Sequence, residues 1–181
     1  MAARARLQSE RKALRQDRSW IRNPQNPLGF EAKPQTLADG TQNLMKWDCA
    51  IPGEKGTIWE GGLLPLTLTF TEDYATAPPA AQFKQAPNGK PIFHPNIFPD
   101  GKVCLSLLKP KPHGGWTPAH TIKMVLVAIQ RLLKEPNNDD AAQADAHNIY
   151  AKPNKAEYNQ KVKAQMLLPG LRDPAYSQDV S

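Results

Sequence analysis

Apolar residues are spaced two apart in the first half of the chain and follow a helical spacing in the second half. Residues 45–51 place Met, Trp, Cys and Ile at alternate positions, and residues 64–70 repeat the pattern with Leu and Phe. This period is typical of strands with one buried face. Between residues 122 and 133, apolar side chains instead recur three and four apart, as on one side of a helix. The sequence therefore predicts an α+β fold, with an antiparallel sheet followed by the helices that cover it.

Two further strands complete the predicted sheet. Strand-forming residues begin at Phe30, and a short run surrounds Phe83, after the Pro78-Pro79 pair. Short turns separate the strands, which favours an antiparallel meander of four strands.

Four helices are predicted around this sheet. The first spans residues 2–17, which contain no Gly or Pro, and the second follows Thr121, a suitable N-cap. The third and fourth are expected at 141–150 and 155–167. Residues 1–168 then form one domain, and 169–181, with Pro, Gly and mixed charge, form a flexible tail. The segments 19–29 and 109–115 are predicted loops, the second flexible.

Positive charge is concentrated near the N-terminus. The net charge of the chain is +6, and Arg11, Arg15 and Arg18 recur at positions i, i+4 and i+7 of the first predicted helix. Such a basic stripe is either a solvated helix face or a docking surface for an acidic protein or nucleic acid.

Several functional classes are disfavoured by what the sequence lacks. No apolar run could span a bilayer, and the basic N-terminus is followed by no apolar segment typical of a secretory signal. Two cysteines without a Cys-x-x-Cys pair indicate a reducing, intracellular setting. The histidines show no metal-ligand spacing, and no nucleotide-binding motif is present, so we expect no metal and no other cofactor.

One proline-rich segment, residues 94–106, carries a thiol and a primary amide. Its two prolines and its Pro-Asp-Gly turn disfavour a regular helix or a central strand. Asn96 precedes Cys104 by eight residues, so an amide could hold the oxyanion formed when a cysteine thioester is attacked. The alternative is a buried cysteine with a turn asparagine.

Motifs along most of the chain resemble those of the ubiquitin-conjugating family, and within it the SUMO-conjugating enzymes. His94-Pro95-Asn96 followed by Gly-x-Val-Cys-Leu is similar to the active-site signature of the family. The following motifs occur in the order expected for the SUMO branch: Asp39-Gly40-Thr41, Ile51-Pro52-Gly53, Trp59-Glu60-Gly61-Gly62, Trp116-Thr117-Pro118-Ala119, Glu135-Pro136-Asn137 and Ala142-Gln143-Ala144.

The resemblance implies a catalytic mechanism and a set of partners. Cys104 would carry SUMO as a thioester, Asn96 would stabilise the oxyanion, and Asp140 would guide the incoming lysine. Phe98, Ala142 and Gln143 would contact the substrate, and Arg11, Lys12 and Arg15 would bind the activating enzyme and, noncovalently, SUMO. The implied partners are SUMO, its activating enzyme, SUMO ligases and substrates with acceptor lysines, with no membrane and no expected nucleic acid. The implied location is the nucleus and cytoplasm.

Several positions depart from the family pattern. Tyr74-Ala75 stands where the family has Tyr-Pro, so we expect a trans peptide bond there. Phe98 replaces the usual Tyr, and Ala141 replaces a Pro. Ala80 and Gln82 occupy the positions of two lysines that read an acidic residue in the substrate, and Lys102 could supply the missing charge.

Some alternatives remain open on the sequence alone. The chain could conjugate ubiquitin itself, or could be a non-catalytic basic scaffold or a nucleic-acid-binding module. Asp140 could simply cap the third helix, and Lys102 could be a solvated turn residue.

Overall fold

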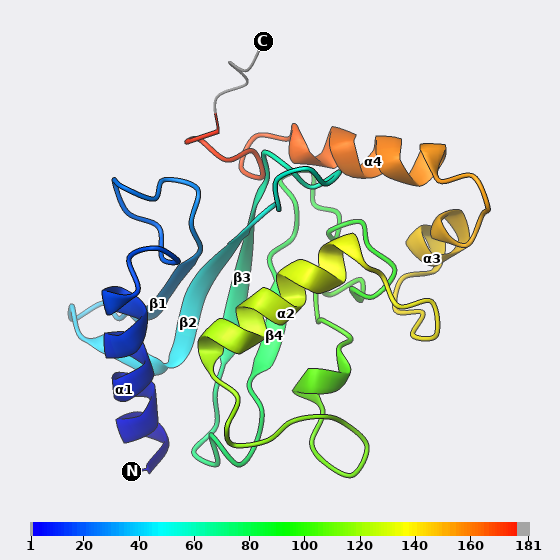
Figure 1. The fold of residues 1–181 in the computed structure, drawn as a ribbon. Helices are drawn as coiled ribbons and strands as arrows, with labels where there is room; N and C mark the ends of the chain where they lie inside the picture. Colours follow the sequence, from blue (N-terminus) through cyan, green and yellow to red (C-terminus); the bar gives the residue numbers. More distant parts are fainter. Residues whose placement is uncertain (1, 177–181) are drawn as a thin grey trace.

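The computed structural model describes residues 2–176 and has the predicted α+β architecture (Figure 1). The elements follow in this order: α1 Ala2–Gln16, β1 Glu31–Thr36, β2 Gln42–Pro52, β3 Leu63–Thr69, β4 Ala80–Phe83, the 3-10 helix η1 Ser106–Leu108, α2 Ile122–Lys134, α3 Ala144–Tyr150 and α4 Ala156–Met166. The order confirms an N-terminal helix, a four-stranded antiparallel sheet and C-terminal helices. No helix of the described residues is both long enough and apolar enough to cross a membrane.

The sheet is a meander in the order β1-β2-β3-β4. Cys49 pairs with Ala32 on one side and with Leu66 on the other, and Leu66 pairs in turn with Phe83. Apart from Met45, which is only partly buried, the alternating apolar residues of β2 and β3 are buried as their spacing predicted, and α2 lies across the sheet in Figure 1. The core therefore lies between the sheet and the apolar side of α2.

The start of α2 matches the sequence prediction, whereas the start of α3 does not. The N-cap at Thr121 is confirmed, since its side chain accepts a hydrogen bond from the Met124 amide. The third helix starts at Ala144 and not at residue 141, because the amides of Ala142 and Gln143 donate to the carbonyl of Pro95. Those residues therefore run beside the active-site segment before the helix begins.

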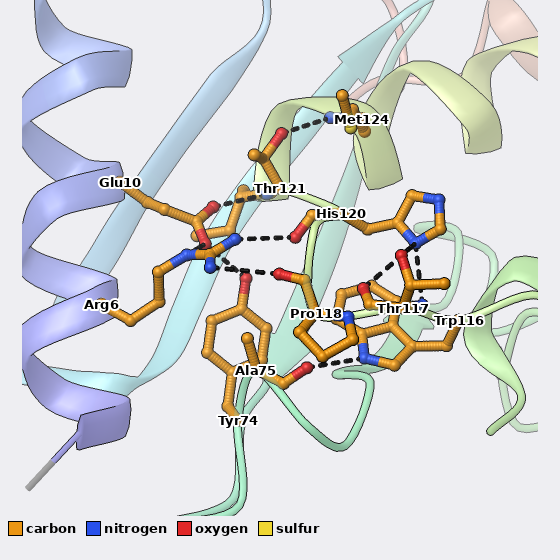
Figure 2. Close-up of polar contacts among 11 residues, drawn as sticks. Arg6, Glu10, Tyr74, Ala75, Trp116, Thr117, Pro118, His120, Thr121 and Met124 are labelled. Carbon is orange, nitrogen blue, oxygen red and sulfur yellow. Dashed lines mark hydrogen bonds and ion pairs between the residues drawn. The ribbon is translucent and has the colours of Figure 1, made fainter. Parts of the chain in front are cut away.

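A buried carboxylate attaches α1 to the rest of the domain (Figure 2). Glu10 accepts hydrogen bonds from Arg6 at 2.7 Å, from the Tyr74 hydroxyl at 2.5 Å and from the Ile122 amide at 2.6 Å. The Glu10 carboxylate therefore connects its own helix, α1, to the segment after β3 and to the N-terminus of α2. Hydrogen bonding to Glu10 and, above all, burial raise the pKa of Tyr74 well above its usual range.

The peptide bond between Tyr74 and Ala75 is cis, so the expectation of a trans bond was wrong. Both residues make specific contacts: Tyr74 donates to Glu10, and the Ala75 carbonyl accepts from the Trp116 indole at 2.8 Å (Figure 2). Tyr74 and Ala75 are therefore each hydrogen-bonded to a distant part of the chain.

The sequence predicted a flexible tail from residue 169, but residues 169–176 pack against the domain. Leu171 and Asp173 are buried, and the amide of Leu63 donates to the carbonyl of Leu171. Asp173 forms a bidentate pair with Arg22, with distances of 3.0 and 2.6 Å. Residues 177–181 lie outside the described part of the chain.

Candidate active site

The active-site segment, residues 94–106, folds back on itself through its Pro-Asp-Gly turn. Phe98 accepts from the Gly101 amide at 2.8 Å and donates to the Lys102 carbonyl at 2.9 Å. Gly101 has a φ of +94°, and a Cβ there would lie 2.1 Å from the Phe83 carbonyl oxygen, so only glycine fits. After the turn, the Cys104 amide donates to the carbonyl of Asn96 at 2.9 Å. The turn therefore brings the amide and the thiol residue side by side.

His94 anchors this segment to the interior of the domain. Its ring is completely buried, Nδ1 accepts from the Asn96 amide at 3.0 Å, and Nε2 lies 2.8 Å from the Leu132 carbonyl. An Nδ1 acceptor requires the proton on Nε2, which then donates to α2. Burial lowers the pKa of His94 to about 4, so the ring is neutral near pH 7 and fixes the segment without contributing charge.

The side chain of Asn96 holds the 137–140 segment next to the cysteine. Its Nδ2 donates to the carbonyls of Asn137 at 2.7 Å and Asp140 at 2.6 Å, and its Oδ1 accepts from the Asn137 amide at 2.8 Å. Both amide hydrogens are therefore engaged in this state. To donate to an oxyanion, Asn96 has to release or share one of them.

Cys104 is partly exposed, whereas Cys49 is buried in the sheet. Burial, assisted by the nearby Asp140 carboxylate, raises the pKa of Cys104, and Lys109 opposes that shift. Burial also raises the pKa of Cys49 far above its usual range, so that thiol is inert. Cys104 is thus the one accessible thiol of the described residues. Its described neighbours do not lower its pKa overall, so the thiol is not strongly activated.

Asp140 lies at the edge of the site and does not cap α3. The residue at the N-cap position is Gln143, without a side-chain cap, because the helix begins three residues later than predicted. One carboxylate oxygen of Asp140 accepts weakly from the Asn137 side chain at 3.3 Å. After the larger effect of burial, the negative charge of Asp140 also raises the pKa of Cys104.

The predicted substrate-contact residues divide into exposed and buried ones. Phe98 and Lys102 are exposed, and Ala142 is partly exposed. Gln143 is buried, and its amide donates to the carbonyls of Ile92 and Ile97 at 2.9 and 3.1 Å. Gln143 therefore supports the active-site segment from inside and does not present its amide to solvent.

Lys102 lies opposite Gln82 in an isolated β-bridge, and its ammonium is 3.7 Å from the Asp100 carboxylate. Two further residues, without a role predicted from the sequence, also act at the site. Asn137 completes the hydrogen bonds of Asn96, and Lys109 acts on the charge of Cys104. The Glu-Pro-Asn motif pointed to Asn137, but no local pattern pointed to Lys109.

The basic side chains of α1 form a separate surface. Arg11, Lys12 and Arg15 border a shallow hollow together with Gln8 and Gln16. Figure 1 shows α1 on the β1 and β2 side of the sheet, whereas η1, which follows Cys104, lies beyond β4. This surface is therefore distinct from the site around the thiol.

Comparison with known proteins agrees with this geometry. The sequence profile described as ubiquitin-conjugating enzyme matches residues 6–166. A SUMO-conjugating enzyme of Arabidopsis thaliana is 48% identical over 163 residues, which cover 90% of this chain and 92% of that protein. SUMO-conjugating enzymes of Caenorhabditis elegans and Dictyostelium discoideum are 47% and 46% identical, covering 90% and 89% of this chain and 89% and 91% of their own length. The chain therefore belongs to the ubiquitin-conjugating enzyme family.

Proposed function

We propose that this protein is a SUMO-conjugating enzyme that accepts SUMO as a thioester on Cys104 and transfers it to substrate lysines. The observation that carries the proposal is the position of the one accessible thiol of the described residues, beside the Asn96-anchored 137–140 segment. The choice of SUMO over ubiquitin is supported by relatives named SUMO-conjugating enzymes at 46–48% identity. A non-catalytic scaffold would have no use for such a thiol.

In the first step, the Cys104 sulfur attacks the thioester that links SUMO to the activating enzyme. The Cys104 thiol proton goes to solvent, and the cysteine of the activating enzyme leaves as a thiolate, which then takes up a proton from solvent. Because burial raises the Cys104 pKa, only a small fraction is thiolate near pH 7. Proximity of the two bound proteins then has to compensate for that small fraction.

In the second step, a neutral substrate amine attacks the thioester carbonyl. The oxyanion that forms loses the extra proton of its attached nitrogen to solvent, collapses to an isopeptide bond and expels the Cys104 thiolate. A lysine with a pKa near ~10.4 is almost wholly protonated at pH 7, so the site has to orient the amine and assist its deprotonation. We assign orientation to Asp140, an apolar wall for the lysine stem to Phe98, and stabilisation of the oxyanion to Asn96.

The basic surface of α1 is proposed to bind the activating enzyme and, noncovalently, SUMO. Its charge and its separation from the thiol suit a docking role. A nucleic-acid partner would make binding fall steeply with salt, with a slope set by the number of phosphates contacted. SUMO ligases and a nuclear and cytoplasmic location belong to the same proposal.

Lys102 is proposed to read an acidic residue in the substrate. Lys102 lies opposite Gln82, which occupies the position of one of the two missing lysines, and this placement supports the role. The Asp100 carboxylate, 3.7 Å from the Lys102 ammonium, competes with the substrate for its charge. An exposed pair is worth about 0.2–1 kcal/mol, so the preference should be a few-fold. The check is the ratio of discharge rates onto two peptides with Glu or Gln two residues after the lysine. Lys102→Glu should lower the ratio of the Glu-peptide rate to the Gln-peptide rate to unity or below at low salt, and an unchanged ratio would mean that Lys102 does not read the acid.

The decisive test of the function is a charging assay with ATP, the activating enzyme and SUMO. Wild-type protein should form an adduct that reductant cleaves, Cys104→Ser should form none, and Cys49→Ala should charge normally. Parallel reactions with ubiquitin and its own activating enzyme decide which modifier is used. A reductant-sensitive adduct on Cys104→Ser would refute the assignment of the thiol.

A further inference from the structure

A groove between α3, α4 and the chain before the active-site segment has no role in the steps described above. It has a volume of about 710 Å³, within the range of about 300–1,000 Å³ typical of ligand sites. The residues that matter for its chemistry are Lys90, Phe93, Asp145, Ile149, Lys161 and Gln165. Pro99 and Gln143, which also line it, belong to the active-site segment and its support, so the groove adjoins the site of transfer.

Gln165 contributes a buried hydrogen-bond donor without an acceptor. The side chain is 8% exposed, and its Oε1 accepts from the Phe93 amide at 2.7 Å, which fixes the orientation of the amide group. Its Nε2 has no hydrogen-bond partner in the described structure. A buried donor without an acceptor is unfavourable, so an acceptor that enters the groove is favoured there.

The rim of the groove is mainly basic. Lys90 and Lys161 are exposed, and neither forms an ion pair with a described residue, while Asp145 supplies one carboxylate in the groove. Outside the groove, Glu157 pairs with Lys152, and the charge of Lys161 helps to lower the Glu157 pKa. The Lys161 ammonium lies 5.9 Å from the centre of the Phe93 ring, so cationic and aromatic groups adjoin. Phe93 and Ile149 provide apolar surface between these charges. A ligand that combines carboxylates with aliphatic side chains matches this lining.

We propose that this groove binds an acidic, aliphatic segment of the protein substrate, outside the residues that flank its acceptor lysine. A carbonyl or carboxylate oxygen of the segment accepts from Gln165, its acidic side chains pair with Lys90 and Lys161, and an aliphatic side chain packs on Phe93. This inference rests on the proposed function, because the position beside the transfer site is what makes the segment part of a substrate.

The test measures binding of fluorescein-labelled peptides to the full chain by anisotropy. One peptide alternates Leu and Glu, and its matched control alternates Leu and Gln. Wild-type protein should bind the acidic peptide and perturb the Gln165 side-chain amide signals in NMR. Lys90→Glu with Lys161→Glu should weaken binding about tenfold, since two exposed pairs become repulsive. Lys163→Glu, an exposed α4 lysine outside the groove, should change binding less than about twofold.

Gln165→Leu should also weaken binding, but it removes the acceptor of the Phe93 amide as well, so the decision rests on the exposed lysines. Equal binding of the two peptides, or equal losses in the groove variant and Lys163→Glu, would overturn the proposal. So would no binding of the acidic peptide, which would leave the Gln165 donor to water.

SUMO charging of the same protein samples separates this inference from the function on which it rests. Normal charging with no peptide binding rejects only the groove. Absent charging rejects the conjugating function and, with it, the assignment of any bound peptide to a substrate.

Discussion

At the scale of single residues, the charge around Cys104 should set the pH at which its thiol ionises. Burial raises the Cys104 pKa most, the Asp140 carboxylate raises it further, and Lys109 lowers it. Asp140→Asn should therefore lower the Cys104 pKa, so that the thiolate forms at lower pH than in the wild type. Lys109→Gln should move the pKa the other way.

The measurement is the rate of alkylation by iodoacetamide as a function of pH, made in a Cys49→Ala background that leaves one thiol. Both shifts should be smaller than the total displacement from an ordinary cysteine, because burial is the largest cause. If neither profile moves, the two charges do not act on the thiol.

Asn96→Ala should charge with SUMO but transfer it to lysine about a hundred- to a thousandfold more slowly, because a donor to the oxyanion is lost. The structure adds a second consequence. The Asn137 amide donates to Asn96 Oδ1, so its hydrogen exchange should become faster in the variant. Slow transfer with unchanged exchange would show that Asn96 acts on the oxyanion alone. Normal transfer with faster exchange would mean that Asn96 only holds the 137–140 segment in place and does not stabilise the oxyanion.

At the scale of elements, the segment after α4 should stabilise the 19–29 loop through one ion pair. The Arg22 side chain is 16% exposed and that of Asp173 is 2% exposed, so removing either partner leaves a charge buried. Arg22→Ala should lower the free energy of unfolding by about 3–5 kcal/mol, because it leaves the buried Asp173 carboxylate without a cation. Asp173→Ala should cost less, because Arg22 keeps its ion pair with Glu31 at 3.6 Å. The double variant should lose less than the sum of the two.

Urea unfolding with a double-mutant cycle measures this coupling. The pair Arg131–Glu135, whose side chains are 74% and 57% exposed, is the matched control. It should contribute only about 0.2–1 kcal/mol. Similar couplings for the two pairs would mean that the 169–176 segment adds little to the stability of the domain.

At the scale of the whole molecule, two separate surfaces should serve two half-reactions. Arg11→Glu with Arg15→Glu should slow charging by the activating enzyme, more at low salt than at high salt, because screening already weakens the interaction at high salt. Transfer from preloaded enzyme should remain nearly unchanged. Charging and single-turnover discharge assays measure the two steps separately.

Lys55→Glu with Lys163→Glu changes the net charge equally at two exposed positions away from the α1 surface. This control should charge normally. An equal loss in the control would mean that net charge, and not the α1 surface, governs the encounter.

The sequence alone determined the parts of the fold that depend on local periodicity and on single residue types. The alternation in residues 45–51 and 64–70, the helical spacing in 122–133 and the Thr121 cap each depend on neighbouring residues, and each was confirmed. The thiol, the amide and the turn that joins them are likewise contained in one short segment, so their proximity could be predicted.

Only the tertiary structure decided features that depend on contacts between distant segments. The Asn96 side chain satisfies groups more than 40 residues away, and Asp173 pairs with Arg22 across 151 residues. The Pro95 carbonyl accepts amides that would otherwise have begun α3 earlier. Local composition predicted a mobile segment at 169–176 and a helix cap at Asp140. Polar residues near a helix end are compatible with a mobile segment and with a cap, so composition alone does not show which of them is present. Which reading applies is set by the burial of each polar group and by the partner that satisfies it, and a single segment does not contain that partner.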